Sequence, residues 1–246
     1  MEKIVSVDNN YIKKVRKLQQ KKYRDAYKLF IVETPHLIKE AINRNLLEVL
    51  LTTNVPDFKV NYKLVSSNVL KSITSLKSVP ESIGIVRFKN EEQIGNRVLI
   101  LDDIQDPGNL GTIIRSSVAF NFDTIILSKN TVDLYNPKVI NATQGMLFNQ
   151  NIIKRELIDI IPFLKNNNYK IYGTDVTNGI DLKEVKKIDK IAIIMGNEGQ
   201  GISKKIKEMV DENIYININK NCESLNVGVA TSIILYELSK GDKNEI

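Results

Sequence analysis

The sequence has very few residues of the types that build disulfides and metal sites. Its 246 residues include one cysteine, Cys222, and one histidine, His36. This inventory excludes a disulfide framework and a site made of cysteine and histidine ligands, so we predict no bound metal. With no histidine nearby to act as its base, Cys222 is interpreted as inert. His36 is interpreted as a surface or packing residue.

Long apolar segments are also absent. No stretch approaches the roughly 18 consecutive apolar residues of a membrane-spanning helix. The N-terminal residues, MEKIVSVDNN, lack the apolar core of a signal peptide. We therefore expect a cytoplasmic protein with no membrane partner.

Positive charge is concentrated at one end of the chain. The formal net charge is +6, and residues 1–30 alone hold nine Lys/Arg against three Asp/Glu. Apolar residues at helical spacing predict an amphipathic helix over residues 9–20. The basic residues on and after this helix are candidate phosphate contacts, namely Lys13, Lys17, Lys21, Lys22 and Arg24. An ordinary solvated helix face is the alternative interpretation.

The element pattern predicts two α/β domains, over residues 1–90 and 97–242. The first alternates short strands and helices, and the polar segment 89–96 separates it from the second. The second has near-continuous apolar runs at 98–103, 124–128, 170–175, 191–196 and 213–218, with helices at 110–121, 137–147, 156–167, 203–211 and 225–240. Such runs are typical of parallel strands that are buried on both faces, so we predict a parallel sheet covered by helices.

Three unusual segments follow strands of the second domain. They are DPGNLGTIIRS (106–116), GNEGQGIS (196–203) and NKNCESLNVGVATS (219–232). Because parallel α/β sheets bind ligands beyond the carboxyl ends of their strands, we expect these segments to converge on one site.

The glycine-rich segment does not follow a phosphate-binding pattern. It fits neither the dinucleotide nor the P-loop motif, and Glu198 in its middle would repel a phosphate. A hydroxyl, an amine or a cation suits this segment better. A nucleotide-dependent oxidoreductase is therefore disfavoured.

The other two segments each open a helix. Asn109 is expected to cap the first helix, which would place Arg115 in its second turn. There the guanidinium could hold a phosphate or a carboxylate, or pair with Glu198 inside the protein. Ser224 is expected to cap the second helix, whose apolar circumference indicates burial in a core or in a dimer interface.

Together these segments resemble the three signature motifs of the SpoU/TrmH family of RNA ribose 2′-O-methyltransferases. NLGTIIRS resembles the first motif, IIMGNEGQGIS the second and SLNVGVATSIILYE the third. The N-terminal stretch KKYRDAYKLFIVETPHLIKEA resembles the substrate-binding domain of the family. Three residues depart from the usual pattern: Thr34 stands in place of glycine, Asn217 in place of proline and Gly228 in place of serine.

The resemblance implies a fold and a reaction. The C-terminal domain would be a SPOUT domain with a deep trefoil knot, preceded by a small L30e-like domain. The protein would use S-adenosyl-L-methionine to methylate a ribose 2′-hydroxyl in structured RNA, as a homodimer. Ribosomal RNA is favoured over transfer RNA as the substrate, and an RNA-binding protein without catalysis is the further alternative.

The resemblance also assigns site residues by motif match. Arg115, Asn109 and Glu198 would be catalytic, with Arg115 gripping a phosphate and stabilising the developing alkoxide. The residues expected at the cofactor are Thr174, Gly196, Asn197, Gly201, Ile216, Ser224, Leu225 and Asn226.

Overall fold

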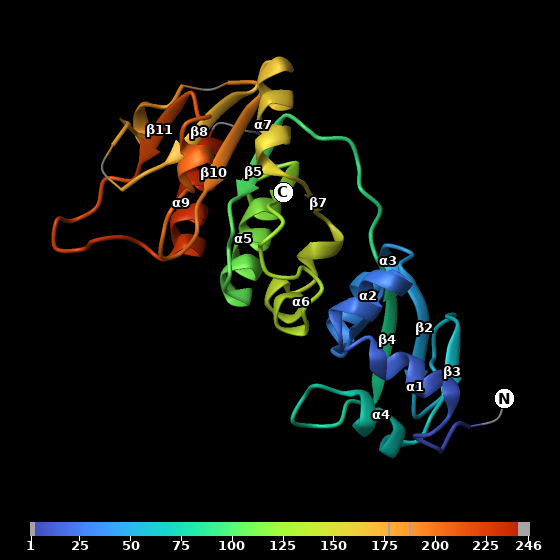
Figure 1. The fold of residues 1–246 in the computed structure, drawn as a ribbon. Helices are drawn as coiled ribbons and strands as arrows, with labels where there is room; N and C mark the ends of the chain where they lie inside the picture. Colours follow the sequence, from blue (N-terminus) through green and yellow to red (C-terminus); the bar gives the residue numbers. More distant parts are fainter. Residues whose placement is uncertain (1–2, 177, 187, 241–246) are drawn as a thin grey trace. The chain divides into compact units, whose positions relative to one another are not determined.

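The computed structural model describes residues 3–176, 178–186 and 188–240. The described chain divides into two compact units, drawn in Figure 1. The first unit comprises the chain up to Asn90 together with Asp133–Phe148, and the second comprises the remainder. The tail after Lys240, which the sequence predicts to be frayed, lies outside the described residues.

The first unit is built on a four-stranded mixed sheet. Its order is β1-β4-β2-β3, with β4 antiparallel to both of its neighbours and β2 parallel to β3. The strands are β1 (Leu29–Val32), β2 (Leu47–Thr52), β3 (Tyr62–Leu64) and β4 (Ser82–Arg87). The helices are α1 (Asn10–Lys17), α2 (Lys21–Tyr27), α3 (Pro35–Asn43), α4 (Ser67–Ile73), α6 (Pro137–Thr143) and the 3₁₀ turn η1 (Met146–Phe148).

The amphipathic N-terminal helix is present but shorter than predicted. Helix α1 ends at Lys17, and a separate helix, α2, begins at Lys21. Ile12 and Val15 of α1 are buried with Val69 and Leu70 of α4 against the small sheet. The apolar face of α1 is therefore the part of the predicted pattern that determines its packing.

A segment from the middle of the chain completes the first unit. The sequence predicts the helix at 137–147 among the elements of the second domain, but its contacts assign it to the first unit. Tyr135 stacks on Phe88 with ring centroids 3.7 Å apart, and Phe148 stacks on Phe30 at 6.2 Å. These aromatic contacts tie the segment to the sheet.

The second unit contains a seven-stranded parallel sheet, as the apolar runs predict. Its order is β7-β6-β5-β10-β8-β11-β9, and every pairing is parallel. The strands are β5 (Arg97–Leu101), β6 (Thr124–Leu127), β7 (Asn151–Lys154), β8 (Lys170–Thr174), β9 (Ile180–Asp181), β10 (Ile191–Met195) and β11 (Glu212–Tyr215). The two edge strands, β7 and β9, are short and were not predicted.

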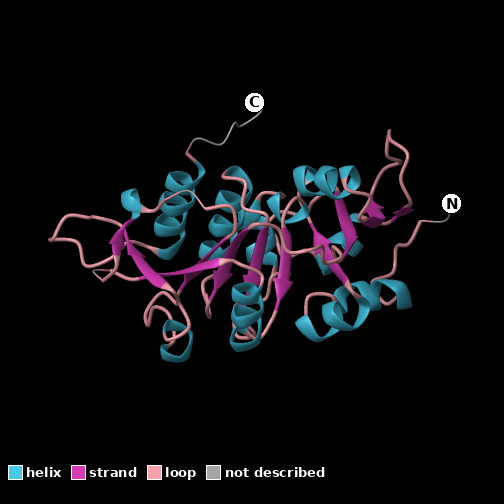
Figure 2. Ribbon diagram, turned by 90° about the horizontal axis from the view of Figure 1, so that it is seen from above, coloured by secondary structure: helices cyan, strands magenta, loops and turns pink. Residues whose placement is uncertain are grey.

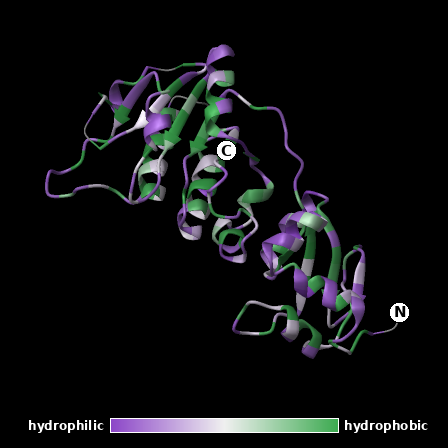
Figure 3. Ribbon diagram, in the orientation of Figure 1, coloured by the Kyte–Doolittle hydropathy of each residue, from purple (hydrophilic) through white to green (hydrophobic). Residues whose placement is uncertain are grey.

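Helices cover both faces of this sheet, as Figure 2 shows. They are α5 (Pro107–Ala119), α7 (Leu157–Asn166), α8 (Lys204–Lys207), α9 (Val227–Ser239) and the 3₁₀ turn η2 (Leu182–Glu184). Ile161 of α7 and Ile206 of α8 pack on Ile100 and Ile194 of the central strands, which are green in the hydropathy view of Figure 3. Burial on both faces explains why these strands are apolar throughout. The predicted α/β class is confirmed.

In the described part of the chain, every helix is too short or too polar to cross a membrane.

Candidate functional site

Side chains from all three segments meet beyond the carboxyl ends of β5 and β10. The Asn109 amide group donates a hydrogen bond to the Glu198 carboxylate at 3.0 Å. The amide oxygen of Asn109 accepts a hydrogen bond from the Asn226 side chain at 2.9 Å. One side chain from each segment thus belongs to a single hydrogen-bonded chain, and the expected convergence is confirmed.

Glu198 holds the start of helix α5 in place. Its carboxylate accepts hydrogen bonds from the backbone N–H groups of Gln105 at 3.2 Å and Asp106 at 3.1 Å. Partial burial raises the pKa of Glu198, but the hydrogen bonds from Asn109 and from these backbone groups outweigh it, so the pKa lies below its ordinary value. The ionised Glu198 carboxylate therefore has a structural role, because it accepts the hydrogen bonds that position Asn109 and the start of α5.

Helix α5 begins earlier than predicted. Asp106, rather than Asn109, is the N-cap, because its carboxylate accepts a hydrogen bond from the Asn109 backbone N–H at 2.8 Å. Asn109 lies inside the first turn, so its side chain is free to join Glu198 and Asn226. Arg115 consequently lies in the third turn of the helix.

Arg115 is solvent-exposed on α5. The alternative interpretation paired it with Glu198, but that carboxylate is engaged by Asn109 and by backbone groups. Within the described residues, the Arg115 guanidinium has neither an ion pair nor a hydrogen bond. It is therefore available to an external anion.

A cavity of about 610 Å³ lies between the second and third segments. All eight residues expected at the cofactor line it: Thr174, Gly196, Asn197, Gly201, Ile216, Ser224, Leu225 and Asn226. Glu198 also lines it, which places the cavity next to the hydrogen-bonded chain. A volume of this size is in the usual range of about 300–1,000 Å³ for small-molecule sites.

The glycine-rich segment forms a tight turn along one wall of the cavity. The backbones of Asn197 and Gly201 exchange two hydrogen bonds, at 3.0 and 2.9 Å. The Asn197 side chain accepts from the backbone N–H of Gly199 at 2.9 Å and donates to the carbonyl of Asp103 at 2.8 Å. Gly196 has no room for a side chain, because a Cβ atom there would lie 2.1 Å from the carbonyl carbon of Gly201.

Two charged residues of the cavity were missed by the sequence analysis. Asp175, directly after β8, forms an ion pair with Lys207 of α8 at 2.5 Å, and both line the cavity. The position of Asp175 beside Thr174, at the carboxyl end of a strand, was a usable signal. No pattern in the sequence pointed to Lys207.

The third segment runs on as a loop past Ser224, which is not the helix cap. Helix α9 starts at Val227, and the Asn226 side chain caps it by accepting from the backbone N–H groups of Gly228 and Val229. A Cβ atom at Gly228 would lie 3.3 Å from Thr112 of α5, so glycine allows the two helices to pack closely. The exposed Asn217 lies between Ile216 and Ile218, which both line the cavity.

In the first unit, four of the five basic residues expected to contact phosphate are exposed: Lys13, Lys17, Lys21 and Lys22. Arg24 is not available to RNA, because it is 4% exposed and both terminal nitrogens of its guanidinium donate to protein acceptors. It donates to the carbonyls of Leu18 and Gln19 and forms an ion pair with Asp133 at 2.5 Å. The prediction of an RNA contact at Arg24 is wrong, because its positive charge stabilises the junction of α1, α2 and the 133–148 segment.

Neither the lone histidine nor the lone cysteine is hydrogen-bonded to Asn109, Glu198 or Asn226. The His36 ring nitrogen Nε2 lies 3.0 Å from the carbonyl oxygen of Gln144, within the first unit. Cys222 is exposed, and its thiol donates to the carbonyl of Ser224 at 3.3 Å. Thr34, which replaces a usual glycine, caps α3 by accepting from the backbone N–H of Leu37 at 3.3 Å.

Comparisons with known proteins match both units. Residues 96–236 match the model of the SpoU rRNA Methylase family, and residues 9–83 match the MRM3-like substrate binding domain. The 23S rRNA (guanosine(2553)-2′-O)-methyltransferase RlmP of Bacillus subtilis is 33% identical over 247 residues, covering 97% of this chain and 99% of that protein.

Solved structures agree with these matches. An rRNA methyltransferase from Sinorhizobium meliloti with bound AdoMet has a TM-score of 0.86 and 26% identity, covering 96% of this chain and 97% of its own. A TrmH/SpoU tRNA modifying enzyme from A. aeolicus has a TM-score of 0.53 and 26% identity, covering 61% of this chain and 76% of its own.

Proposed function

This chain belongs to the SpoU rRNA methylase family of S-adenosylmethionine-dependent RNA ribose 2′-O-methyltransferases, and we propose that its substrate is ribosomal RNA. Two similarities support ribosomal over transfer RNA. The Bacillus subtilis relative, named for a 23S rRNA position, matches nearly the full length of both chains, whereas the tRNA modifying enzyme from A. aeolicus covers 61% of this chain. We place the reaction in the cytoplasm, where ribosomal RNA is found.

The cavity of the second unit fits the cofactor. Its wall at Gly196 and Gly201 is bare backbone, and its apolar side is formed by residues such as Ile216 and Leu225. Backbone groups for a nucleoside and apolar side chains for its rings are what such a ligand requires. S-adenosylmethionine supplies an electrophilic methyl group when it is bound.

We assign to Arg115 the role of acting on the ribose 2′-hydroxyl that is methylated. A guanidinium keeps its protons at any physiological pH, so it cannot act as a general base. Its unpaired positive charge suits a grip on the phosphate next to the target ribose and stabilisation of the developing alkoxide. The bound cofactor would supply the methyl group to the 2′-oxygen and leave as S-adenosylhomocysteine, and the hydroxyl proton would pass to a phosphate oxygen or to water.

Asn109 and Glu198 act by positioning. Together they link the start of α5 to the turn that walls the cavity and, through Asn226, to the start of α9. The helix that carries Arg115 is therefore fixed relative to the cofactor residues. Correct positioning of two reactants is worth up to about 7–11 kcal/mol of the barrier in favourable cases.

We propose a homodimer formed through α9. Val229, Ile233 and Tyr236 lie on one side of this helix and are 47%, 37% and 53% exposed. Their spacing of four and three residues makes a continuous apolar stripe, and a second copy of the chain would bury it. Because α5 packs beside α9, this interface would lie near Arg115.

Tritium transfer from labelled S-adenosylmethionine tests the proposed substrate. The acceptors are unmodified ribosomal and transfer RNA transcripts, and Arg115→Ala is the matched inactive control. We expect label in ribosomal RNA at an alkali-resistant linkage, as 2′-O-methylation requires, and its loss in the variant. Label in transfer RNA alone would refute the ribosomal assignment, and an absence of both label and cofactor binding would indicate an RNA-binding protein without catalysis.

A further inference from the structure

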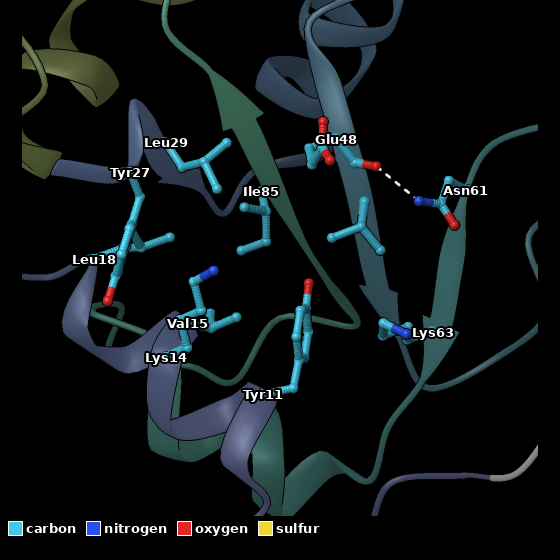
Figure 4. Close-up of a pocket in the computed structure, with 11 residues that line it drawn as sticks. Tyr11, Lys14, Val15, Leu18, Tyr27, Leu29, Glu48, Asn61, Lys63 and Ile85 are labelled. Carbon is cyan, nitrogen blue, oxygen red and sulfur yellow. Dashed lines mark hydrogen bonds between the residues drawn. The ribbon is translucent and has the colours of Figure 1, made fainter. Parts of the chain in front are cut away.

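A second pocket, of about 270 Å³, lies in the first unit between α1 and the four-stranded sheet. Figure 4 shows its side chains. Val15 of α1 and Ile85 of β4 form an apolar floor, and Tyr11 and Tyr27 stand on opposite sides. The pocket is somewhat smaller than the usual range of about 300–1,000 Å³ for drug-sized ligands, so it suits a single ring system.

The two tyrosines present ring surface that already attracts positive charge. The Lys14 ammonium lies 4.7 Å from the ring centroid of Tyr27, and the Lys63 ammonium lies 5.2 Å from that of Tyr11. Both lysines line the pocket. Aromatic rings with ammonium groups beside them are the elements with which proteins hold unpaired nucleotides, because the rings stack on the base and the cations attract its phosphates.

One end of the pocket is polar. Figure 4 shows the Tyr11 hydroxyl directed toward Glu48, at the start of β2. Burial, together with the charge of Glu48, raises the pKa of Tyr11 to about 12, so its hydroxyl stays protonated. The Glu48 carboxylate, 46% exposed, forms an ion pair with Arg87 at 3.0 Å that involves one of its two oxygens.

We propose that this pocket binds one unpaired base of the RNA substrate, stacked between Tyr11 and Tyr27, and that Glu48 selects guanine. An ionised carboxylate only accepts hydrogen bonds. Guanine is the one RNA base with two adjacent donors, N1–H and N2–H, on its Watson–Crick edge. Lys14 and Lys63 hold the flanking phosphates. The proposal rests on the proposed function, since it takes RNA as the substrate, and it concerns a nucleotide other than the one that is methylated.

The basic residues next to the pocket favour an RNA base over an uncharged small molecule as its ligand. Lys14 belongs to the same basic segment as the exposed Lys13 and Lys17, so the pocket opens beside a surface that attracts the RNA backbone. Sequence-specific RNA recognition mostly targets unpaired bases, which are stacked on aromatic side chains and hydrogen-bonded at their edges. The pocket offers both kinds of contact within one compact unit.

The test uses the full chain labelled with 3-fluorotyrosine. Fluorine NMR resolves signals of the nine tyrosines, and Tyr11→Phe and Tyr27→Phe assign the two of interest. The probes are the RNA pentamers UUGUU, UUAUU, UUCUU and UUUUU, with saturating S-adenosylhomocysteine to fill the other cavity. We expect UUGUU to shift both assigned signals and to bind about 5- to 100-fold more tightly than the other three.

Three variants separate the contribution of ring stacking from that of guanine selection. Tyr27→Leu keeps an apolar side chain but removes the ring, and should weaken UUGUU binding about 5- to 100-fold. Glu48→Gln should remove the preference for guanine while stacking remains. Glu81→Gln, an exposed carboxylate of the same unit outside the pocket, is the matched control and should change neither. Circular dichroism checks that each variant is folded.

Several results would overturn the proposal. The proposal fails if the Tyr11 and Tyr27 signals do not shift when RNA is added, or if all four pentamers bind with equal affinity. It also fails if Tyr27→Leu binds UUGUU as tightly as the wild-type protein does, or if this variant changes its oligomeric state while its RNA binding is not weakened. In methyl transfer, Tyr27→Leu should raise the KM for RNA and leave kcat unchanged. If the wild-type protein methylates no ribosomal RNA, the proposed substrate fails, while the pentamer titration still reports on the pocket.

Discussion

Replacing Gly196 by alanine should disable the cofactor cavity. The added Cβ would lie 2.1 Å from the carbonyl carbon of Gly201 and 2.2 Å from the backbone nitrogen of Ile202. These are backbone atoms, so no rotamer change relieves the overlap. The turn that begins at Asn197 must move away from β10.

The structure gives the size of the effect. Displacing the turn breaks the two backbone hydrogen bonds between Asn197 and Gly201, each worth about 0.5–1.5 kcal/mol net. Overpacking a buried position costs about 1–3 kcal/mol more. The total is about 2–6 kcal/mol, divided between stability and cofactor binding. If the whole cost falls on cofactor binding, even the lower limit of about 2 kcal/mol weakens the affinity for S-adenosylmethionine roughly 30-fold.

Isothermal titration with S-adenosylmethionine measures the loss of cofactor affinity, and chemical denaturation measures the loss of stability. Gly199→Ala is the matched control in the same turn, because the nearest atom to its added Cβ is the Asn197 side-chain oxygen at 3.7 Å, an ordinary contact. We expect this control to stay within about 0.5 kcal/mol of the wild-type protein in both measurements. If Gly196→Ala bound the cofactor as tightly as Gly199→Ala and unfolded at the same denaturant concentration, the packing argument would be refuted.

Further predictions concern charge and assembly. Arg115→Lys should lower kcat about 100- to 1,000-fold and leave cofactor affinity unchanged, and near-normal turnover in single-turnover assays would exclude a bidentate grip. The pKa of Glu198 is lowered in the folded protein, so its contribution to stability is present above its ordinary pKa of 4.5 and is lost as the pH falls through the lowered value. Denaturation between pH 3 and 6 should therefore show a shallower acid loss for Glu198→Gln than for the wild-type protein, and parallel curves would contradict this. Arg24→Met should cost about 3–5 kcal/mol of unfolding free energy, because it removes a buried guanidinium and leaves the Asp133 carboxylate, whose side chain is 17% exposed, without its ion pair, whereas Lys21→Met, which removes an exposed ion pair, should cost at most about 1 kcal/mol. Ile233→Glu should convert the proposed dimer to a monomer in light scattering, and a dimer that survives this change would place the interface elsewhere.

The two helices that begin near the site, α5 and α9, are capped by other residues than the sequence predicts. Asn109 and Ser224 both have side chains that cap helices, but Asp106 and Asn226 fill these positions. The difference matters for the site, since Asn109 is released from capping and joins Glu198. Local propensity identifies the residue types that begin a helix, and contacts between segments decide which of them is used.

The basic N-terminal segment gives a similar lesson. Composition treats Lys13, Lys22 and Arg24 alike, as positive charges near one helix. The structure separates them, because Asp133, more than 100 positions away, captures Arg24 in the interior. Only the packing of the 133–148 segment against the rest of the first unit could show this, because periodicity carries no information about such long-range contacts.

The sequence by itself determined the α/β class, the parallel sheet and the family, because apolar runs and motif spacing are local properties of the chain. Motif matches also assigned eight residues to the cofactor, six in segments that follow strands and two, Thr174 and Ile216, in predicted strands, and all eight line one cavity. Tertiary structure alone decided that Glu198 binds Asn109 rather than Arg115, that Asp175 and Lys207 pair at the cavity, and that Tyr11 and Tyr27 face one another across a pocket. Each of these depends on the relative placement of elements far apart in the chain, which is set by how the helices pack on the two sheets.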